Sequence, residues 1–108
     1  MSELSELNRA IRDLSDLWAI CTDDDQCEAL LNKRDELDRQ AGELANLIIH
    51  DGSDELGHAI ISLNELSASA TTAKQEIDNV AEKIRKTAKV IDKATKAIGK
   101  VASLIAKL

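Results

Sequence analysis

The chain has 108 residues, a net charge of −6, no proline and a single aromatic residue, Trp18. This length allows one domain, and a chain rich in Leu, Ile, Val and Ala with almost no aromatic residues lacks the usual material of a sheet. We therefore predict an all-α fold that forms one helical domain over residues 1–108.

The sequence gives no indication of a membrane segment. Acidic and polar residues follow Met1, where a secretory leader would have basic and then apolar residues. The longest uncharged run with large apolar residues, 56–64, is too short to cross a bilayer. The expected location is the cytoplasm, and secretion by a signal-independent system remains open.

The first predicted helix covers residues 2–21. Ser2 is a suitable N-cap, and large apolar residues follow at three- and four-residue spacing, so they share one face of the helix. Such a face must be buried against another element. Its residues are Leu4, Leu7, Ile11, Leu14 and Trp18.

The second predicted helix covers residues 23–50. Thr22 can cap it, and the three aspartates at 23–25 suit the positive end of the helix dipole. Because only a short turn separates the first two helices, we expect an antiparallel helical hairpin. The apolar stripe of this helix consists of Cys27, Leu30, Leu31, Leu37, Ala41, Leu44 and Ile48.

The third predicted helix, over residues 54–107, is long and carries a heptad pattern. Gly52 can end the preceding helix, and Ser53 can cap this one. The alternative to a continuous helix is a break near 67–72, where only Ser, Ala and Thr occur, but the heptad register passes through unchanged. A straight helix of this length would measure about 80 Å and extend far beyond the hairpin.

The unpaired end of this long helix is the basis for predicting an oligomer. Isoleucine recurs at every seventh position from Ile77 to Ile105, and so many large aliphatic side chains are too costly to leave in water. We predict a coiled coil or helical bundle, a dimer or a tetramer, with this stripe at the interface. The predicted interface residues are Leu56, Leu63, Ile77, Val80, Ile84, Ile91, Ile98, Val101 and Ile105.

Charge is distributed unevenly along the chain. Residues 1–58 contain fifteen acidic and five basic residues, whereas residues 59–108 contain nine basic and five acidic ones. The two regions can meet, within or between chains, or face solvent separately. The candidate acidic partner surface comprises Asp23, Asp24, Asp25, Asp35, Glu36 and Asp38, and the candidate basic face comprises Lys86, Lys89, Lys93, Lys96 and Lys100.

Few residues indicate a chemical role. Cys21 and Cys27 flank the first turn, where a disulfide could form, but we expect two separate buried thiols in a chain without a secretory signal. The aspartates at 23–25 lack the glycine and distal glutamate of a calcium loop, and His50 and His58 lack a third ligand. We find no catalytic motif and expect no enzyme activity, cofactor, metal or small-molecule substrate.

These patterns favour a non-enzymatic protein that associates with other proteins, in the first place with itself, through the amphipathic heptad helix. One alternative is a small acidic protein, of the immunity or chaperone kind, that binds a basic toxin or secreted partner. The other is a protein that binds membrane surfaces through its cationic C-terminal helix. Nucleic acid is not expected as a partner, because the chain is acidic and its basic region has no aromatic residue for base stacking.

Overall fold

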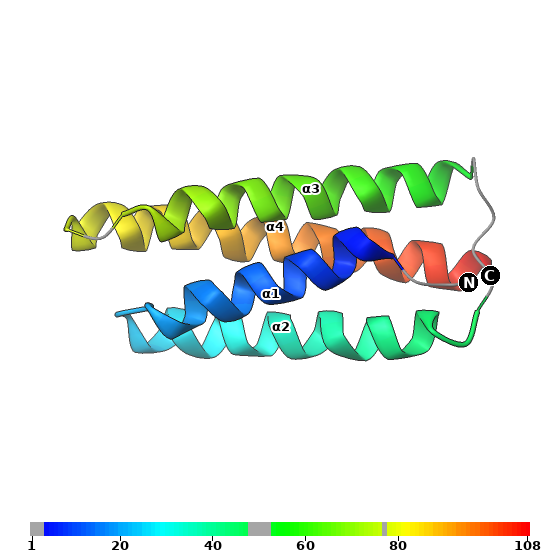
Figure 1. Cartoon of the computed structure of the whole chain (residues 1–108), viewed down its shortest axis with the longest axis horizontal. Coiled ribbons are helices and arrows are strands. Elements are labelled where there is room, and N and C mark those ends of the chain that lie inside the picture. Colours follow the sequence, from blue (N-terminus) through cyan, green and yellow to red (C-terminus); the bar gives the residue numbers. More distant parts are fainter. Residues whose placement is uncertain (1–3, 48–52, 77) are drawn as a thin grey trace.

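A computed structural model describes residues 4–47, 53–76 and 78–108. Four helices occur in these ranges: α1 (Ser5–Ala19), α2 (Asp24–Leu44), α3 (Asp54–Lys74) and α4 (Val80–Lys107). The described ranges contain no strand, and the predicted all-α class is confirmed. The helices lie side by side in a bundle of 44 × 20 × 18 Å (Figure 1).

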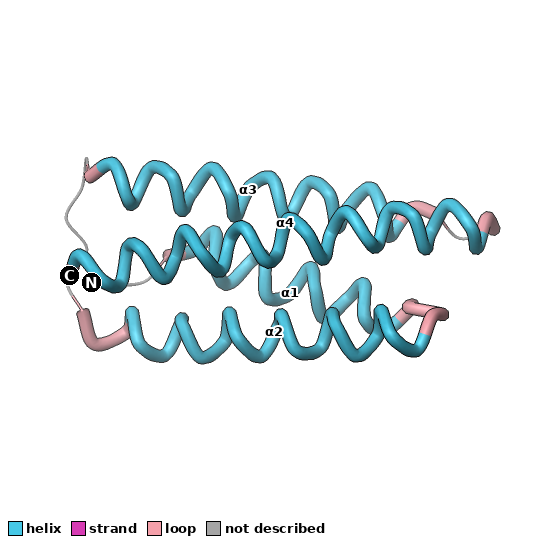
Figure 2. The backbone as a smooth tube through the Cα atoms, turned by 180° about the vertical axis from the view of Figure 1, so that it is seen from behind, coloured by secondary structure: helices cyan, strands magenta, loops and turns pink. Residues whose placement is uncertain are grey.

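Two antiparallel hairpins form the bundle. The first is the predicted hairpin of α1 and α2, and the second consists of α3 and α4 (Figure 1). Both α1 and α4 contact α2 and α3, so α1 and α4 lie on one diagonal of the bundle. Neighbouring helices of different hairpins run parallel, α1 beside α3 and α2 beside α4. From behind, α4 lies between α3 and α2 (Figure 2).

The chain divides the predicted helix over 54–107 into α3 and α4, so the prediction of one continuous helix is wrong. α3 ends at Lys74 and α4 begins at Val80, whereas the suspected stretch at 67–72 is helical. Within that stretch the hydroxyl of Thr71 donates a hydrogen bond to the carbonyl of Ser67 at 2.9 Å. This bond to the preceding turn allows threonine to remain in a helix.

A cap that the heptad pattern concealed begins α4. Asn79 has an extended backbone, and its side chain accepts a hydrogen bond from the backbone N–H of Glu82 at 3.0 Å. Because the chain reverses here, α4 folds back along α2 and α3. The apolar overhang that was expected to require a second chain is therefore packed within one chain.

The buried face of α4 is not its isoleucine row. It is a row of smaller residues at three- and four-residue spacing, which includes Thr87, Val90 and Ala94. Ile91, Ile98 and Ile105 occupy the adjacent position on the helix surface and pack against the edge of the core. Small inner side chains leave room for the leucines of the other helices. The core comprises Leu4, Leu7, Ala10, Leu14, Leu17, Leu30, Leu37, Leu44, Ala59, Leu63, Leu66, Ala70, Ala73, Val90, Ala94, Ala97, Val101 and Leu104.

The predicted bounds of the first two helices are too wide. α1 begins at Ser5, and residues 1–3 lie outside the described ranges. α2 ends at Leu44, before the predicted end at residue 50. The predicted helix stop falls within 48–52, which is also outside the described residues.

The helix caps agree in part with the prediction. Ser53 caps α3, because its hydroxyl accepts a hydrogen bond from the backbone N–H of Leu56 at 3.1 Å. The cap of α2 is Asp23 instead of Thr22, and its carboxylate accepts from the backbone N–H of Gln26 at 2.9 Å. A carboxylate at this position also favours the helix dipole.

Candidate interaction surfaces

Two glutamine side chains set the register of the parallel helices α2 and α4. The amide N–H of Gln26 donates to the carbonyl of Ile84 at 2.8 Å, and that of Gln40 donates to the carbonyl of Ile98 at 2.9 Å. Both pairs are 58 residues apart in sequence, so the alignment is the same at two points separated by two heptads. The isoleucine row of α4 therefore follows the seam with α2.

The predicted interface residues have different environments in this fold. Leu63 and Val101 are fully buried within the chain. Val80 and Ile84 are exposed, to 52% and 36% of their surface. Ile77 lies outside the described residues. The other four pack against the edge of the core: Leu56, Ile91, Ile98 and Ile105.

Exposed apolar side chains occur at the end of the bundle where both hairpins turn. Val80 and Ile84 lie in the first turns of α4, and Ile20 follows the last turn of α1. The ammonium group of Lys83 connects these segments by donating to the carbonyl of Ile20 at 3.2 Å. Trp18, one residue before the end of α1, is also exposed. None of these apolar residues belongs to the row of charged residues described next.

Five lysines of α4 form a row on the side that faces α3. Their three- and four-residue spacing keeps them on one side of the helix. Two ion pairs tie the row to the other half of the hairpin, Lys93 with Glu65 at 3.3 Å and Lys86 with Glu76. We call the surface between this row and α3 the cationic groove. Its lysines are the predicted basic residues Lys86, Lys89, Lys93, Lys96 and Lys100.

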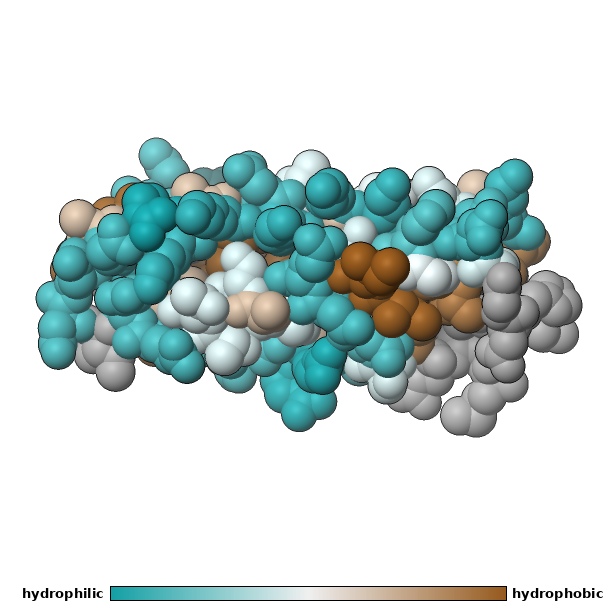
Figure 3. Space-filling model, turned by 90° about the horizontal axis from the view of Figure 1, so that it is seen from above, coloured by the Kyte–Doolittle hydropathy of each residue, from teal (hydrophilic) through white to brown (hydrophobic). Residues whose placement is uncertain are grey.

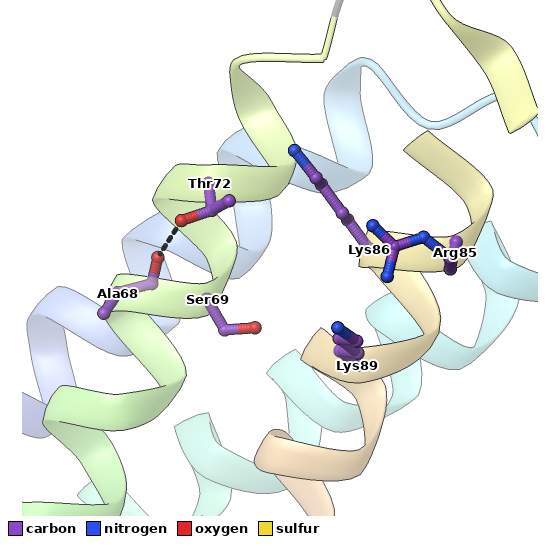
Figure 4. Close-up of a pocket in the computed structure, with 6 residues that line it drawn as sticks. All are labelled: Ala68, Ser69, Thr72, Arg85, Lys86 and Lys89. Carbon is purple, nitrogen blue, oxygen red and sulfur yellow. Dashed lines mark hydrogen bonds between the residues drawn. The ribbon is translucent and has the colours of Figure 1, made fainter. Parts of the chain in front are cut away.

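A shallow hollow of about 240 Å³ lies at the α3–α4 turn end of the cationic groove. Basic side chains line it on α4, and small ones line it on α3, where Ser69 points toward α4 (Figure 4). Thr72 belongs to the same wall, and its hydroxyl donates to the carbonyl of Ala68 at 3.1 Å. A wall of small residues leaves space for another side chain or backbone. The lining residues are Ala68, Ser69, Thr72, Arg85, Lys86 and Lys89.

A second hollow continues the groove toward the start of α3. Its lining includes Ile61 and Glu65 on α3, and Lys96 and Lys100 on α4. Ile61 is the most exposed large apolar residue of the described chain, at 59%. Seen from the α3 side, the surface is mainly hydrophilic or neutral, and its largest hydrophobic area lies right of centre (Figure 3). The groove thus combines cationic and apolar contacts.

Arg85 extends the lysine row but was absent from the predicted basic face. It lies four residues before Lys89, so its spacing was a usable signal. Its guanidinium donates two hydrogen bonds to the carboxylate of Glu82, at 2.8 and 2.6 Å. These bonds lower the pKa of Glu82 and raise the pKa of Arg85. Glu82 therefore offsets the positive charge of Arg85.

The acidic surface lies on the exposed side of α2. Arg39 forms ion pairs with Glu36 and Glu43, and Arg34 pairs with Asp35 at 2.8 Å. The hydrogen bond from Arg39 lowers the pKa of Glu36. Other exposed carboxylates of α2 have no ion-pair partner within the described ranges: Asp24, Asp25, Glu28 and Asp38.

Acidic and basic surfaces do not neutralise each other within the chain. No ion pair joins α2 to α4 in the part of the chain that the structure describes. The ion pairs between helices involve acidic residues outside α2: Asp13 and Asp16 on α1 pair with Lys74 at 3.2 and 3.5 Å, and Glu65 and Glu76 pair with lysines of α4. Both α2 and the cationic groove keep most of their charge.

Cys21 and Cys27 form a disulfide bond across the α1–α2 turn, with their Cα atoms 5.6 Å apart. The expectation of two separate thiols is therefore wrong for this structure. The bond closes a short loop around Asp23, the cap of α2. It holds the end of α1 beside the beginning of α2.

Metal ligation and membrane insertion find no support in the described residues. Among them, no three His, Cys, Asp or Glu side chains are grouped as a metal site requires. The four helices are also too short or too polar to pass through a membrane within these ranges. His58 lies in the hollow that contains Lys96, and His50 is outside the described residues.

Comparisons with protein-family models, curated proteins and solved structures find no match. A functional hypothesis for this helical bundle consequently depends on its own surfaces.

Proposed function

We propose that this protein is a non-enzymatic helical module that associates with an acidic protein surface through the cationic groove. The lysine row carries this proposal, because Lys89, Lys96 and Lys100 have no ion-pair partner among the described residues. Neighbouring like charges repel each other, and binding of opposite charges relieves that repulsion. Self-association is the simplest form, since the chain also carries an acidic surface.

A protein fits the cationic groove better than a nucleic acid does. Its α3 side offers small residues such as Ser69 and the exposed apolar side chain of Ile61, which suit a packed helix. Trp18 is the single Phe, Tyr or Trp residue of the chain and lies on α1, so the groove lacks the large aromatic rings on which bases stack most strongly. The net charge of −6 also opposes binding of polyphosphates.

The charged groups of the groove support binding more than catalysis. Its carboxylates, Glu65 and Glu76, are already engaged by lysines. The hydroxyl group of Thr72 in the groove wall donates a hydrogen bond to the carbonyl of Ala68 in the same helix. An activated nucleophile needs a base within hydrogen-bond distance, and none of these contacts provides one.

Calorimetric titration with a synthetic helical peptide, bearing Glu at three- and four-residue spacing, tests the groove. The peptide should bind, and affinity should fall as salt screens exposed charges. The double variant Lys89→Glu, Lys96→Glu should abolish binding. A control with the same change in charge, Arg12→Glu, Lys33→Glu, should leave it unchanged. Equal affinity for both variants would refute the groove as the binding surface.

A second candidate function uses the opposite surface. The unpaired carboxylates of α2 favour binding of a basic protein, such as a toxin or a secreted partner. Substitution of Glu28 and Asp38 by lysine would then abolish binding of the basic protein, whereas the Lys89→Glu, Lys96→Glu variant would still bind it. This candidate would be excluded if the variant at Glu28 and Asp38 kept binding the basic protein and the variant at Lys89 and Lys96 lost it.

Binding to anionic membrane surfaces is a third candidate, favoured by the same lysine row. In the folded bundle the apolar face of α4 is buried, so binding through lysines alone would not raise helicity. Co-sedimentation with phosphatidylserine vesicles, monitored by circular dichroism, tests this mode. Absence of both sedimentation and a spectral change would exclude it.

The disulfide bears on the two locations that the sequence left open. Disulfides such as Cys21–Cys27 persist mainly in oxidising compartments, which favours a location outside the cytoplasm. Thiol labelling of the protein in its native cells, with and without prior reduction, would distinguish them. Labelling without prior reduction would show that the two cysteines are free thiols in the cell, as the prediction of a cytoplasmic location requires.

A further inference from the structure

We propose that the occupant of the cationic groove is helix α2 of a second copy of the chain. This inference rests on the proposed function and identifies its partner. The two surfaces carry opposite charge: α4 has eight basic and two acidic residues, whereas α2 has seven acidic and three basic ones. The argument depends on their length, on the availability of their charges and on their positions in the bundle.

The charged rows have the same length. Lysines of the groove extend from Lys86 to Lys100, fourteen residues along α4, or about 21 Å of helix. The acidic row on the outer side of α2 extends from Asp24 to Asp38, also fourteen residues and about 21 Å, and Glu43 beyond it is paired with Arg39. In both rows the charges recur at three, four or seven residues, so each row remains on one side of its helix. The acidic row is Asp24, Glu28, Asp35 and Asp38.

Most of these charges are free to bind. Asp24, Glu28 and Asp38 are exposed and make no ion pair within the described ranges, and the same is true of Lys89 and Lys96. A contact between the rows would therefore form new ion pairs without breaking existing ones at these positions.

The groove can admit a helix at close range. Its wall on α3 includes Ala68, Ser69 and Thr72, which project little from the helix. Two carboxylates in or beside the groove could repel α2, but Glu65 and Glu76 are paired with lysines of the row. Their negative charge is thereby offset.

The positions of the surfaces determine the form of assembly. The α3–α4 side and the α1–α2 side are opposite faces of the bundle (Figures 1 and 2). A copy whose groove holds α2 of a neighbour keeps its own α2 exposed on the other side. The contact is therefore heterologous, and it continues from copy to copy until a ring closes or a filament forms.

A charge exchange tests this arrangement. Variant A, Glu28→Lys with Asp38→Lys, reverses two of the four charges of the acidic row and leaves the groove unchanged. Variant B, Lys89→Glu with Lys96→Glu, reverses two of the five charges of the lysine row and leaves α2 unchanged. Each variant alone should remain monomeric in sedimentation velocity, at concentrations where the unaltered protein associates. An equimolar mixture should associate, because the unaltered groove of variant A can bind the unaltered α2 of variant B, and the new glutamates of variant B can pair with the new lysines of variant A.

A matched control separates this contact from the effect of net charge. Asp16→Lys with Asp78→Lys changes the net charge as much as variant A does, at exposed positions outside both α2 and the lysine row. This control should associate like the unaltered protein. A mixture of variants A and B that stays monomeric would overturn the inference, as would an unaltered protein that is monomeric at every concentration.

Titration with the acidic peptide described above distinguishes the proposed function, binding through the groove, from the inference that the bound partner is a second copy. If the unaltered chain is monomeric but binds the peptide through Lys89 and Lys96, the groove is a binding site and its partner is another acidic protein. If the chain neither associates nor binds the peptide, the proposed function fails together with this inference.

Discussion

The side-chain amide of Gln40 donates a hydrogen bond to the backbone carbonyl of Ile98, at 2.9 Å, from a position that is 1% exposed. Its own oxygen, Oε1, is buried without a hydrogen-bond partner in the described part of the chain. Gln26 makes the equivalent contact with Ile84 at 2.8 Å, nearer to solvent. A buried amide with one unsatisfied atom lowers stability, while its single bond favours one register of α2 against α4.

Replacement of Gln40 by leucine should stabilise the protein. The change removes an unsatisfied buried oxygen, and an apolar side chain of similar size can fill the space, so we expect about 1 kcal/mol more free energy of unfolding. Urea titration followed by circular dichroism measures it. Gln26→Leu is the matched control and should have little effect, because Gln26 is only partly buried. A loss of stability in Gln40→Leu would mean that the hydrogen bond outweighs the unsatisfied oxygen.

Alanine substitutions in α4 should distinguish its buried row from its isoleucine row. Leu104 is 1% exposed, and Leu104→Ala should reduce the free energy of unfolding by about 2–5 kcal/mol. Ile84 is 36% exposed, so Ile84→Ala should cost less than about 1.5 kcal/mol. Thermal or urea denaturation would measure both. The reverse order would indicate that the isoleucine row is the main packing surface.

Reduction of the Cys21–Cys27 disulfide should destabilise the protein without unfolding it. The bond closes a loop with a sequence separation of 6 residues. Its loss should cost about 2 kcal/mol, because a loop this short restricts the unfolded chain only modestly. Urea titration with and without reductant measures the difference. In a Cys21→Ser, Cys27→Ser variant the reductant should have no effect, and a protein that unfolds on reduction would contradict the prediction.

Acid should lower the stability of the bundle, because it protonates two carboxylates that accept hydrogen bonds from arginines. Hydrogen bonds from Arg39 and Arg85 lower the pKa values of Glu36 and Glu82 from 4.5. A lowered pKa in the folded state gives stability that is complete above the unfolded pKa and is lost as pH falls through the folded pKa. The thermal midpoint should therefore be nearly constant from about pH 7 to pH 5 and decrease below about pH 4.5.

A variant isolates the contribution of one of these carboxylates. Glu82→Gln should have a lower midpoint than the unaltered protein at neutral pH, and the difference should disappear at about pH 3, where Glu82 is protonated. A difference that persists in acid would assign the effect to packing instead of charge.

Local signals in the sequence predict much of this fold, and long-range packing accounts for the errors. Composition and periodicity identify the helices, and Ser53 is recognisable as a cap because its chemistry is local. The break between α3 and α4 was missed because the heptad of Ile77 and Ile84 continues across it. A seven-residue repeat records which side of a helix is apolar, and it does not record where the chain turns.

The same limit applies to the surfaces. Lys89 and Lys96 were recognised as part of a basic row from their spacing alone. Their neighbours on α3, such as Ser69 and Ile61, could not be assigned to the same groove, since no local pattern states which helix lies beside α4. The acidic residues of α2 were recognised as a group from their positions in the sequence, and only the tertiary fold shows that they lie opposite the groove.

The order of the two hairpins along the chain could be exchanged without changing the bundle. α1 begins and α4 ends toward the same end of the bundle, which is also the end where α2 and α3 are connected (Figure 1). A circular permutant that links the original ends and opens between α2 and α3 would keep each hairpin intact, because both hairpins form from adjacent segments. The fold therefore consists of two hairpins whose order along the chain can be exchanged without changing how they pack.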